Sequence, residues 1–176
     1  MNASFLKPHP TDRLSLAELR SRWQRMLEDP LLRELPGKVE LNQKGAIEVS
    51  PANPRHGRFQ ALVASELRRL RPDGETITEC PIETELGIRV PDVVWASPEF
   101  MRGRGMDSPF SSAPELCIEV LSPTNSGIEI NEKVGAYLAA GAVEVWLVAE
   151  DGDIEMFTAS GPIEASSLSI ALALPQ

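Results

Sequence analysis

Two apolar segments of the chain each carry one acidic residue. Asp92 lies within residues 90–95, and Glu119 lies within residues 116–121. A carboxylate inside an apolar strand is costly to bury unless a cation or a proton meets it. If the two segments are neighbouring strands, both carboxylates point toward one position, and the pattern therefore predicts a site for a divalent metal ion.

Such a site would suit the hydrolysis of a phosphodiester, which needs a cation to neutralise developing charge and to lower the pKa of an attacking water. Hard cations such as Mg²⁺ prefer oxygen ligands and keep several waters, so few protein ligands suffice. Asp92, Glu119 and the backbone carbonyl of Val120 would be those ligands for Mg²⁺ or Mn²⁺. Lys133 follows Glu119 by 14 positions, and it would position the water or stabilise charge in the transition state.

Three helices are expected from apolar spacing and from their start and stop signals. The first spans 16–28, begins with a capping box of Ser15 and Glu18, and stops at Pro30. The second spans 55–70 and ends at a Pro-Asp-Gly turn, and the third spans 129–140 and ends at a glycine.

Short apolar runs predict the strands. Residues 38–50 form a hairpin signal around a turn that contains Gly45. Further strands are expected, with a loop over 97–114, at residues 75–80, 88–96, 116–121, 143–148, 154–158 and, weakly, 167–173. Helices interleaved with strands, but without strict alternation, predict an α/β fold with a mixed central β-sheet flanked by helices.

The domain organisation follows from the absence of a dividing linker in the sequence. We expect a single domain over residues 1–176. It would comprise an N-terminal helical extension over 1–36, a core over 37–160 and a C-terminal tail or strand over 161–176.

The charge balance bears on the partners of the protein. The chain has 17 basic and 26 acidic residues, a formal net charge of −9, which argues against a large nonspecific nucleic-acid footprint. Local basic clusters at 68–71 and 102–104 would form either a basic face or solvated surface. Metal-binding carboxylates also add to the acidic total while being neutralised in use.

Several other features predict a cytoplasmic protein with an ordinary core. The opening residues lack the apolar segment of a secretory signal, and no run approaches the roughly 20 residues that span a membrane, so we expect no membrane contact. Cys80 and Cys117 are therefore expected as buried thiols. Tyr137 and Trp146 are expected as core aromatics, and Glu40 receives no role.

Taken in order, these segments resemble the Uma-two family of restriction-endonuclease-like proteins, within the PD-(D/E)xK nuclease superfamily. The resemblance covers residues 38–157 and rests on 89–94, 113–123, 132–133, 137–141 and 144–148. It implies a restriction-endonuclease-like core in which Asp92 and Glu119 are the two motif acids. Leu121 stands where the nuclease pattern has its lysine, and the family resemblance implies that Lys133 replaces it from the following helix.

The function that these observations predict is a metal-dependent endonuclease that hydrolyses DNA. We expect a homodimer, because cutting both strands commonly takes two active sites and the first helix with Trp23 offers an apolar face. The alternatives are a noncatalytic binding or scaffold protein that retains the nuclease fold, and an enzyme that cleaves RNA or single strands.

Each candidate residue also has a structural interpretation. Asp92 would bond loop amides at the start of a strand, and Lys133 would pair with Glu129 one helical turn away. His56 would cap or pack near the start of the second helix. Glu66, an acid on the apolar face of that helix, would pair with a core arginine. As site residues, Glu66 would support the metal ligands or be a further ligand, and His56 would support them or act as a general base.

Overall fold

The computed structural model describes residues 13–174, apart from 33, 105–106 and 123–125. The described helices are α1 (Leu16–Glu28), α2 (Pro54–Leu70), α3 (Pro98–Met101) and α4 (Gly127–Ala139). None of these helices combines the length and the apolar character that a membrane crossing requires.

The strands form two sheets. The large sheet has six strands in the order β10 (Gly161–Ile163), β9 (Ile154–Thr158), β8 (Glu144–Val148), β7 (Leu116–Val120), β6 (Val93–Ala96) and β3 (Glu75–Thr78). The small sheet has four, in the order β2 (Ile47–Ser50), β1 (Lys38–Asn42), β5 (Gly87–Arg89) and β4 (Ile82–Thr84). Only β7 and β8 pair in parallel among these strands.

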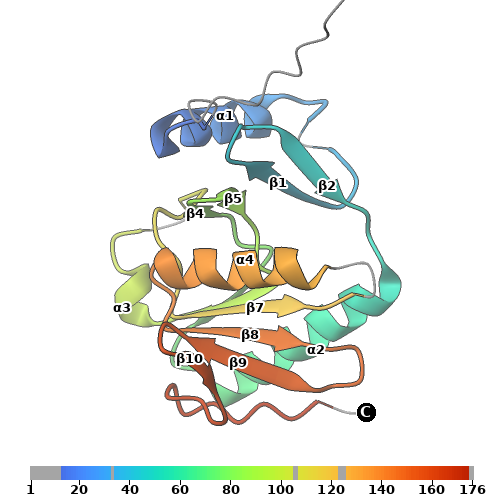
Figure 1. Cartoon of the computed structure of the whole chain (residues 1–176), viewed down its shortest axis with the longest axis vertical. Helices are drawn as coiled ribbons and strands as arrows, with labels where there is room; N and C mark the ends of the chain where they lie inside the picture. The colour runs from blue at the N-terminus through green and yellow to red at the C-terminus, as the bar shows by residue number, and fades with distance from the viewer. Residues whose placement is uncertain (1–12, 33, 105–106, 123–125, 175–176) are drawn as a thin grey trace, which may run out of the picture.

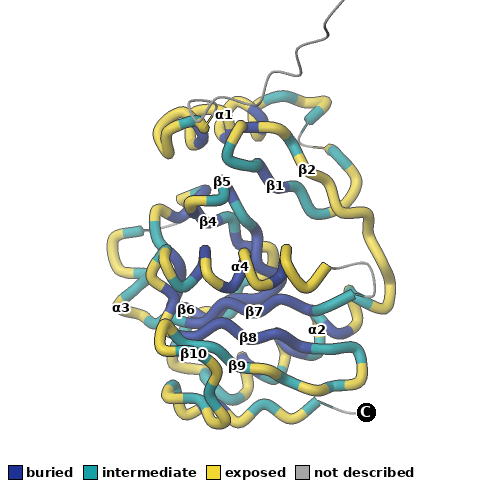
Figure 2. Tube along the Cα trace, in the orientation of Figure 1, coloured by how far each residue is buried: buried dark blue, intermediate teal, exposed yellow. Residues whose placement is uncertain are grey.

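The large sheet lies between two helices, with α4 on one face and α2 on the other (Figure 1). Strands β7 and β8 are buried along their whole length (Figure 2). Because side chains alternate between the faces of a strand, Cys117 packs with Tyr137 of α4, whereas Leu116 and Ile118 pack with Val63 of α2. Glu119 follows the alternation of Cys117 and therefore faces α4.

The small sheet carries helix α1 at the other end of the molecule (Figure 1). The expected capping box is present, with Glu18 N donating to Ser15 Oγ and Ser15 N donating to Glu18 Oε2. Trp23 is only 4% exposed and packs against the small sheet with Leu41 and Ile88. Its ring is therefore part of the protein's own core, which removes it from the exposed apolar face that we expected for an oligomer.

The expected strand over 88–96 is in fact two strands that belong to different sheets. β5 ends at Arg89 in the small sheet, and β6 begins at Val93 in the large sheet. The N–H of Val90 donates to the Glu40 carboxylate and Pro91 has no N–H, so neither residue donates to a ladder and the pairing ends after Arg89. The break carries the chain from one sheet to the other and leaves Asp92 at the junction.

The prediction of a C-terminal strand over 167–173 is wrong. The last strand of the described chain is β10 at Gly161–Ile163. The polar groups of the tail are satisfied by side chains instead of a ladder. Ser167 donates from both its N and its Oγ to the buried Glu144 carboxylate, and the Leu168 carbonyl accepts from Arg71. The tail is thereby tied to the large sheet without joining it.

Two smaller expectations concern the core and a loop. Cys80 and Cys117 are free and buried, and burial raises the pKa of Cys80 to about 12, as expected of inert thiols. Tyr137 and Trp146 are buried as expected. The segment expected as a loop over 97–114 contains the short helix α3, which Ser97 caps through its hydroxyl.

Candidate active site

Asp92 and Glu119 lie on the same side of the large sheet. Strands β6 and β7 pair antiparallel with Val93 opposite Ile118, so one further step of the register places Asp92 opposite Glu119. Both residues are buried, at 1% and 4% exposure. The backbone N–H of Val120 donates to Asp92 Oδ2 at 2.8 Å and holds this carboxylate against the end of β7.

A cation of the protein itself lies between the two carboxylates. Lys38 Nζ is 2.8 Å from Asp92 Oδ1 and 3.3 Å from Glu119 Oε2. Lys38 begins β1, so its side chain reaches from the small sheet to the large one. The sequence interpretation missed Lys38, since nothing in its local pattern distinguishes it from a surface lysine.

Lys133 also lies in this cluster. Its Nζ is 3.5 Å from Glu119 Oε1 and 3.1 Å from Glu40, and the residue is 8% exposed. Within the described part of the chain, these are its ion pairs, and Glu129 is instead exposed on the first turn of α4. Lys133 therefore bridges an acid of the small sheet and an acid of the large sheet.

Glu40 is a site residue to which the sequence assigned no role. It is 5% exposed, and its carboxylate accepts from the N–H of Val90 at 2.8 Å and from Arg89 Nη1 at 3.2 Å. The signal that could have found it is the one used for Asp92, because Glu40 is an acid between the apolar Val39 and Leu41 in a predicted strand.

Tyr137, expected only as a core aromatic, contacts the site through its hydroxyl, which donates to Glu119 Oε1 at 2.7 Å. Glu119 Oε1 therefore accepts from Tyr137 and Lys133, and its Oε2 accepts from Lys38. A carboxylate fixed on both oxygens presents its remaining lone pairs in a defined direction.

Helix α2 brings two polar side chains to Asp92. His56 Nε2 lies 3.1 Å from Asp92 Oδ1, and Gln60, one turn later, donates to the Asp92 backbone carbonyl at 3.0 Å. Glu66 pairs at 2.8 Å with the exposed Arg69 and not with a core arginine, and it does not line the cleft. It lies ten positions after His56, which places it ~15 Å further along the helix.

Burial and the neighbouring charges together shift the pKa values of the two motif acids in opposite directions. Burial raises the pKa of Glu119, against the lowering effect of Lys38 and Lys133. Burial also acts to raise the pKa of Asp92, but the hydrogen bond from His56 and the charge of Lys38 outweigh it and hold this pKa below its usual value. The Asp92 carboxyl group therefore stays ionised, whereas Glu119 depends on the nearby cations to stay ionised.

The site opens into a cleft of about 580 Å³ between the start of α2, the hairpin β1–β2 and α4. Its lining includes His56, Asp92, Glu119, Val120 and Lys133. The cluster is therefore accessible from one side while its carboxylates remain largely dry.

The donor set fits a hard divalent cation. The two carboxylates already share one cationic group, Lys38 Nζ, and Val120 lines the same cleft. Among the described residues, no three His, Cys, Asp or Glu side chains are grouped closely enough to bind a metal together. An ion here would take Asp92, Glu119 and the Val120 carbonyl, with water as the further ligands, which is the way Mg²⁺ is usually held.

The comparison with family models decides the family. The model of Uma2, described as “Putative restriction endonuclease”, matches residues 23–171, which include both sheets and every residue of the cluster. The chain belongs to the Uma2 family. A comparison with curated proteins finds no match.

A solved structure supports the fold of this Uma2 chain. It is a protein from Anabaena variabilis described as a “putative nuclease belonging to DUF820”. The two share 20% sequence identity with a TM-score of 0.60, over 85% of this chain and 93% of that chain. At this identity the similarity shows the fold, and it confirms the restriction-endonuclease-like α/β architecture expected from the sequence.

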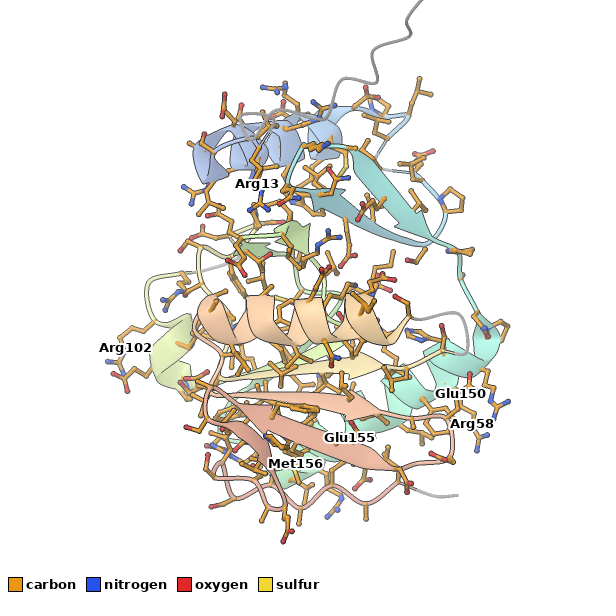
Figure 3. All side chains as sticks on the ribbon, in the orientation of Figure 1. Arg13, Arg58, Arg102, Glu150, Glu155 and Met156 are labelled. Carbon is orange, nitrogen blue, oxygen red and sulfur yellow. The ribbon has the colours of Figure 1, made fainter. Side chains whose placement is uncertain are left out.

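The basic clusters of the Uma2 chain lie outside the cleft. Arg71 stacks on the ring of Trp95 at 3.7 Å, and Arg104 stacks on Phe100 at 4.1 Å. Arg102 projects from the end of α3 at the edge of the molecule (Figure 3). Parts of both clusters therefore have structural roles, and neither cluster lines the cleft of the site.

Proposed function

We propose that this Uma2 chain is a metal-dependent endonuclease that hydrolyses DNA phosphodiester bonds. The observation that carries the proposal is the pair of buried carboxylates, Asp92 and Glu119, which meet at one cation position at the base of an open cleft. Family membership supports this reaction class, because the family is described as “Putative restriction endonuclease”.

The residues of the chain divide the work among them. Asp92, Glu119 and the Val120 carbonyl would hold Mg²⁺ or Mn²⁺, which supplies charge neutralisation and a more acidic water when bound. Tyr137 and the Val120 N–H fix the orientation of the carboxylates. Lys133 would orient the attacking water or stabilise the charge on the phosphoryl oxygens, which fixed cations do best in a water-poor site.

His56 supports this arrangement from the other side of Asp92. The hydrogen bond to Asp92 raises the pKa of His56, against the effect of burial. A protonated His56 donates to the carboxylate and fixes its rotamer, and Gln60 does the same for the backbone at this position. We assign both as positioning residues of the metal ligands.

The test is the cleavage of supercoiled plasmid in Mg²⁺ or Mn²⁺ by the wild type and by Asp92→Asn and Glu119→Gln. Glu155→Gln is the matched control, because Glu155 is exposed on β9 and does not line the cleft (Figure 3). We expect the control to cleave as the wild type does and the two site variants to lose at least about a hundredfold in rate. Absence of wild-type cleavage with either ion, or equal cleavage by all four proteins, would contradict the proposal.

Substrate and assembly need separate measurements. Circular single-stranded DNA and RNA, incubated in parallel, show whether the same site prefers an unpaired strand. We also propose a homodimer, since two sites would cut both strands, and analytical ultracentrifugation with and without DNA tests it. A monomer in both conditions would contradict the dimer and leave strand-by-strand nicking.

The second candidate function is a noncatalytic binding protein that retains the nuclease fold. Lys38 favours it, because its ammonium already neutralises the two carboxylates without a metal. Isothermal titration with Mn²⁺ separates the two candidate functions. The endonuclease predicts Mn²⁺ binding that Asp92→Asn abolishes, and the noncatalytic protein predicts no such binding.

A further inference from the structure

Lys38 occupies an unusual position for a lysine at the start of a strand. Its side chain is 13% exposed, and its ammonium contacts one oxygen of each motif acid. It lies on the small sheet, where it pairs with Ser50, while Glu119 lies on the large sheet. The preceding Gly37 has a φ of +102°, and a Cβ there would meet the Ser50 carbonyl, so the backbone that aims Lys38 is tightly placed.

This ammonium and a metal ion cannot share the same place. Metal–oxygen bonds to Mg²⁺ are about 2.0–2.1 Å long, so an ion bound by both carboxylates would lie inside the space that Lys38 Nζ now fills. The two positive charges would also repel each other strongly in a buried site. One must leave for the other to bind.

We propose that Lys38 is an internal counter-ion that competes with the divalent cation, so that it sets the metal concentration at which the site fills. This inference rests on the proposed metal centre. It makes the metal-free protein a stable state in which the lysine takes the place of the ion.

The structure offers the displaced lysine somewhere to go. A lysine ammonium is a compact charge on a flexible stem, and the cleft beside it opens to solvent. Glu79 and Glu129 are exposed residues that line this cleft, and they provide new partners for the released ammonium. The movement therefore needs a change in side-chain rotamers and no rearrangement of either sheet.

The competition is measured by Mn²⁺ binding without DNA, followed by electron paramagnetic resonance at pH 8. Lys38→Met removes the competing charge, and Lys44→Met, on the exposed turn of the same hairpin, removes the same charge elsewhere. An opposite charge at this distance changes the proton affinity of a carboxylate by roughly ten- to thousandfold. We expect Lys38→Met to bind Mn²⁺ at least about tenfold more tightly than the wild type, and Lys44→Met to bind as the wild type does.

Lys38→Arg is the control in case Lys38→Met fails to fold, because arginine keeps a positive charge at this position. We expect it to bind Mn²⁺ no more tightly than the wild type. If Lys38→Met is unfolded when no metal is present, the two variants are compared by the Mn²⁺ that each needs to fold. In that case the inference requires that the Mn²⁺ concentration that refolds Lys38→Met is lower than the Mn²⁺ concentration that stabilises Lys38→Arg. Equal or weaker Mn²⁺ binding by Lys38→Met, or no binding by any variant, overturns the inference.

A second readout uses the wild type alone. The chain has four lysines, at positions 7, 38, 44 and 133, so brief amine labelling and peptide mass spectrometry can follow each one. Saturating Mg²⁺ should increase the labelling of Lys38 and leave that of Lys44 unchanged. Unchanged or decreased labelling of Lys38 overturns the competition.

These results are independent of cleavage. A protein that never cuts DNA but gains Mn²⁺ affinity on Lys38→Met supports the counter-ion and contradicts the endonuclease. A protein that cuts DNA through Asp92 and Glu119, but whose Mn²⁺ affinity ignores Lys38, supports the endonuclease and contradicts the counter-ion.

Discussion

Glu40 and Lys133 form a buried ion pair of 3.1 Å although 93 positions separate them in the sequence. Glu40 belongs to the small sheet and Lys133 to the helix that covers the large sheet. Their contact joins the two halves of the fold next to the motif acid Glu119, which Lys133 also contacts. The stability of the fold and the geometry of the proposed site therefore depend on the same side chain.

Removing one member of this pair should destabilise the fold. Glu40→Gln leaves the ammonium of Lys133 and the guanidinium of Arg89 short of a charge partner, and we expect a loss of about 3 kcal/mol in the free energy of unfolding. Urea unfolding measures it. In a double-mutant cycle, Glu40→Gln with Lys133→Met should cost less than the sum of the single variants, and additivity would show that the pair is not coupled.

Lys133 should matter more for the rate of cleavage than for metal binding. Lys133→Met removes the charge proposed to act on the phosphate, and we expect the cleavage rate at saturating Mg²⁺ to fall by about 10²–10³-fold. Mn²⁺ binding should persist, because Asp92 and Glu119 remain. Glu132→Gln, at the exposed neighbouring position of α4, is the control for changes in that helix. Full cleavage by Lys133→Met would remove Lys133 from the mechanism.

The contact between His56 and Asp92 predicts a pH dependence in the metal-free protein. The folded-state pKa of His56 is raised above its ordinary 6.5, first by the hydrogen bond to Asp92. The stabilisation is therefore complete below about pH 6.5 and is lost as the pH rises through the folded-state pKa. The stability advantage of the wild type over His56→Gln should shrink over that rise.

Proton NMR measures this pKa directly, because the chain has only two histidines, at positions 9 and 56. In Asp92→Asn the pKa of His56 should fall below its wild-type value. An unchanged value would mean that the carboxylate does not hold the imidazolium.

The tail gives a second pH dependence, of opposite sign. Burial acts to raise the pKa of Glu144, but hydrogen bonds from Ser167, Trp146 and Ser166 outweigh it and lower this pKa. The stabilisation is present above the ordinary pKa of 4.5 and is lost as the pH falls through the lower folded-state value. Glu144→Gln should therefore be less stable than the wild type at pH 7, by roughly 1–3 kcal/mol.

The difference between the two proteins should narrow toward pH 3 in urea titrations. A constant difference over this range would show that the charge of Glu144 is not what holds the tail.

Much of the local structure was readable in the sequence because it depends on neighbours along the chain. The capping box of α1, the hairpin turn and the glycine after α4 are determined by residues a few positions apart, and all three are present. An acid in an apolar strand is a local signal as well, and it pointed to Asp92 and Glu119. The segments around these acids, taken in their order along the chain, also indicated the family, which the family model confirms.

Contacts between distant segments were not readable in the same way. The strand expected over 88–96 divides at Pro91 because the chain crosses between sheets there, and only the presence of a second sheet reveals this. Tyr137 was expected only as a core aromatic, and nothing in the sequence around it indicates that its hydroxyl meets Glu119.

The sequence by itself determined most of the elements, the fold class and the two buried acids, because alternation and capping act over a few residues. Only the tertiary structure decided which cations meet those acids. Lys38 and Glu40 reach the site because the tertiary fold brings β1 of the small sheet next to the acids, and Lys133 does so because α4 covers that face of the large sheet. A charge at the surface and a charge in a buried cluster look alike along the chain, and burial alone makes the difference.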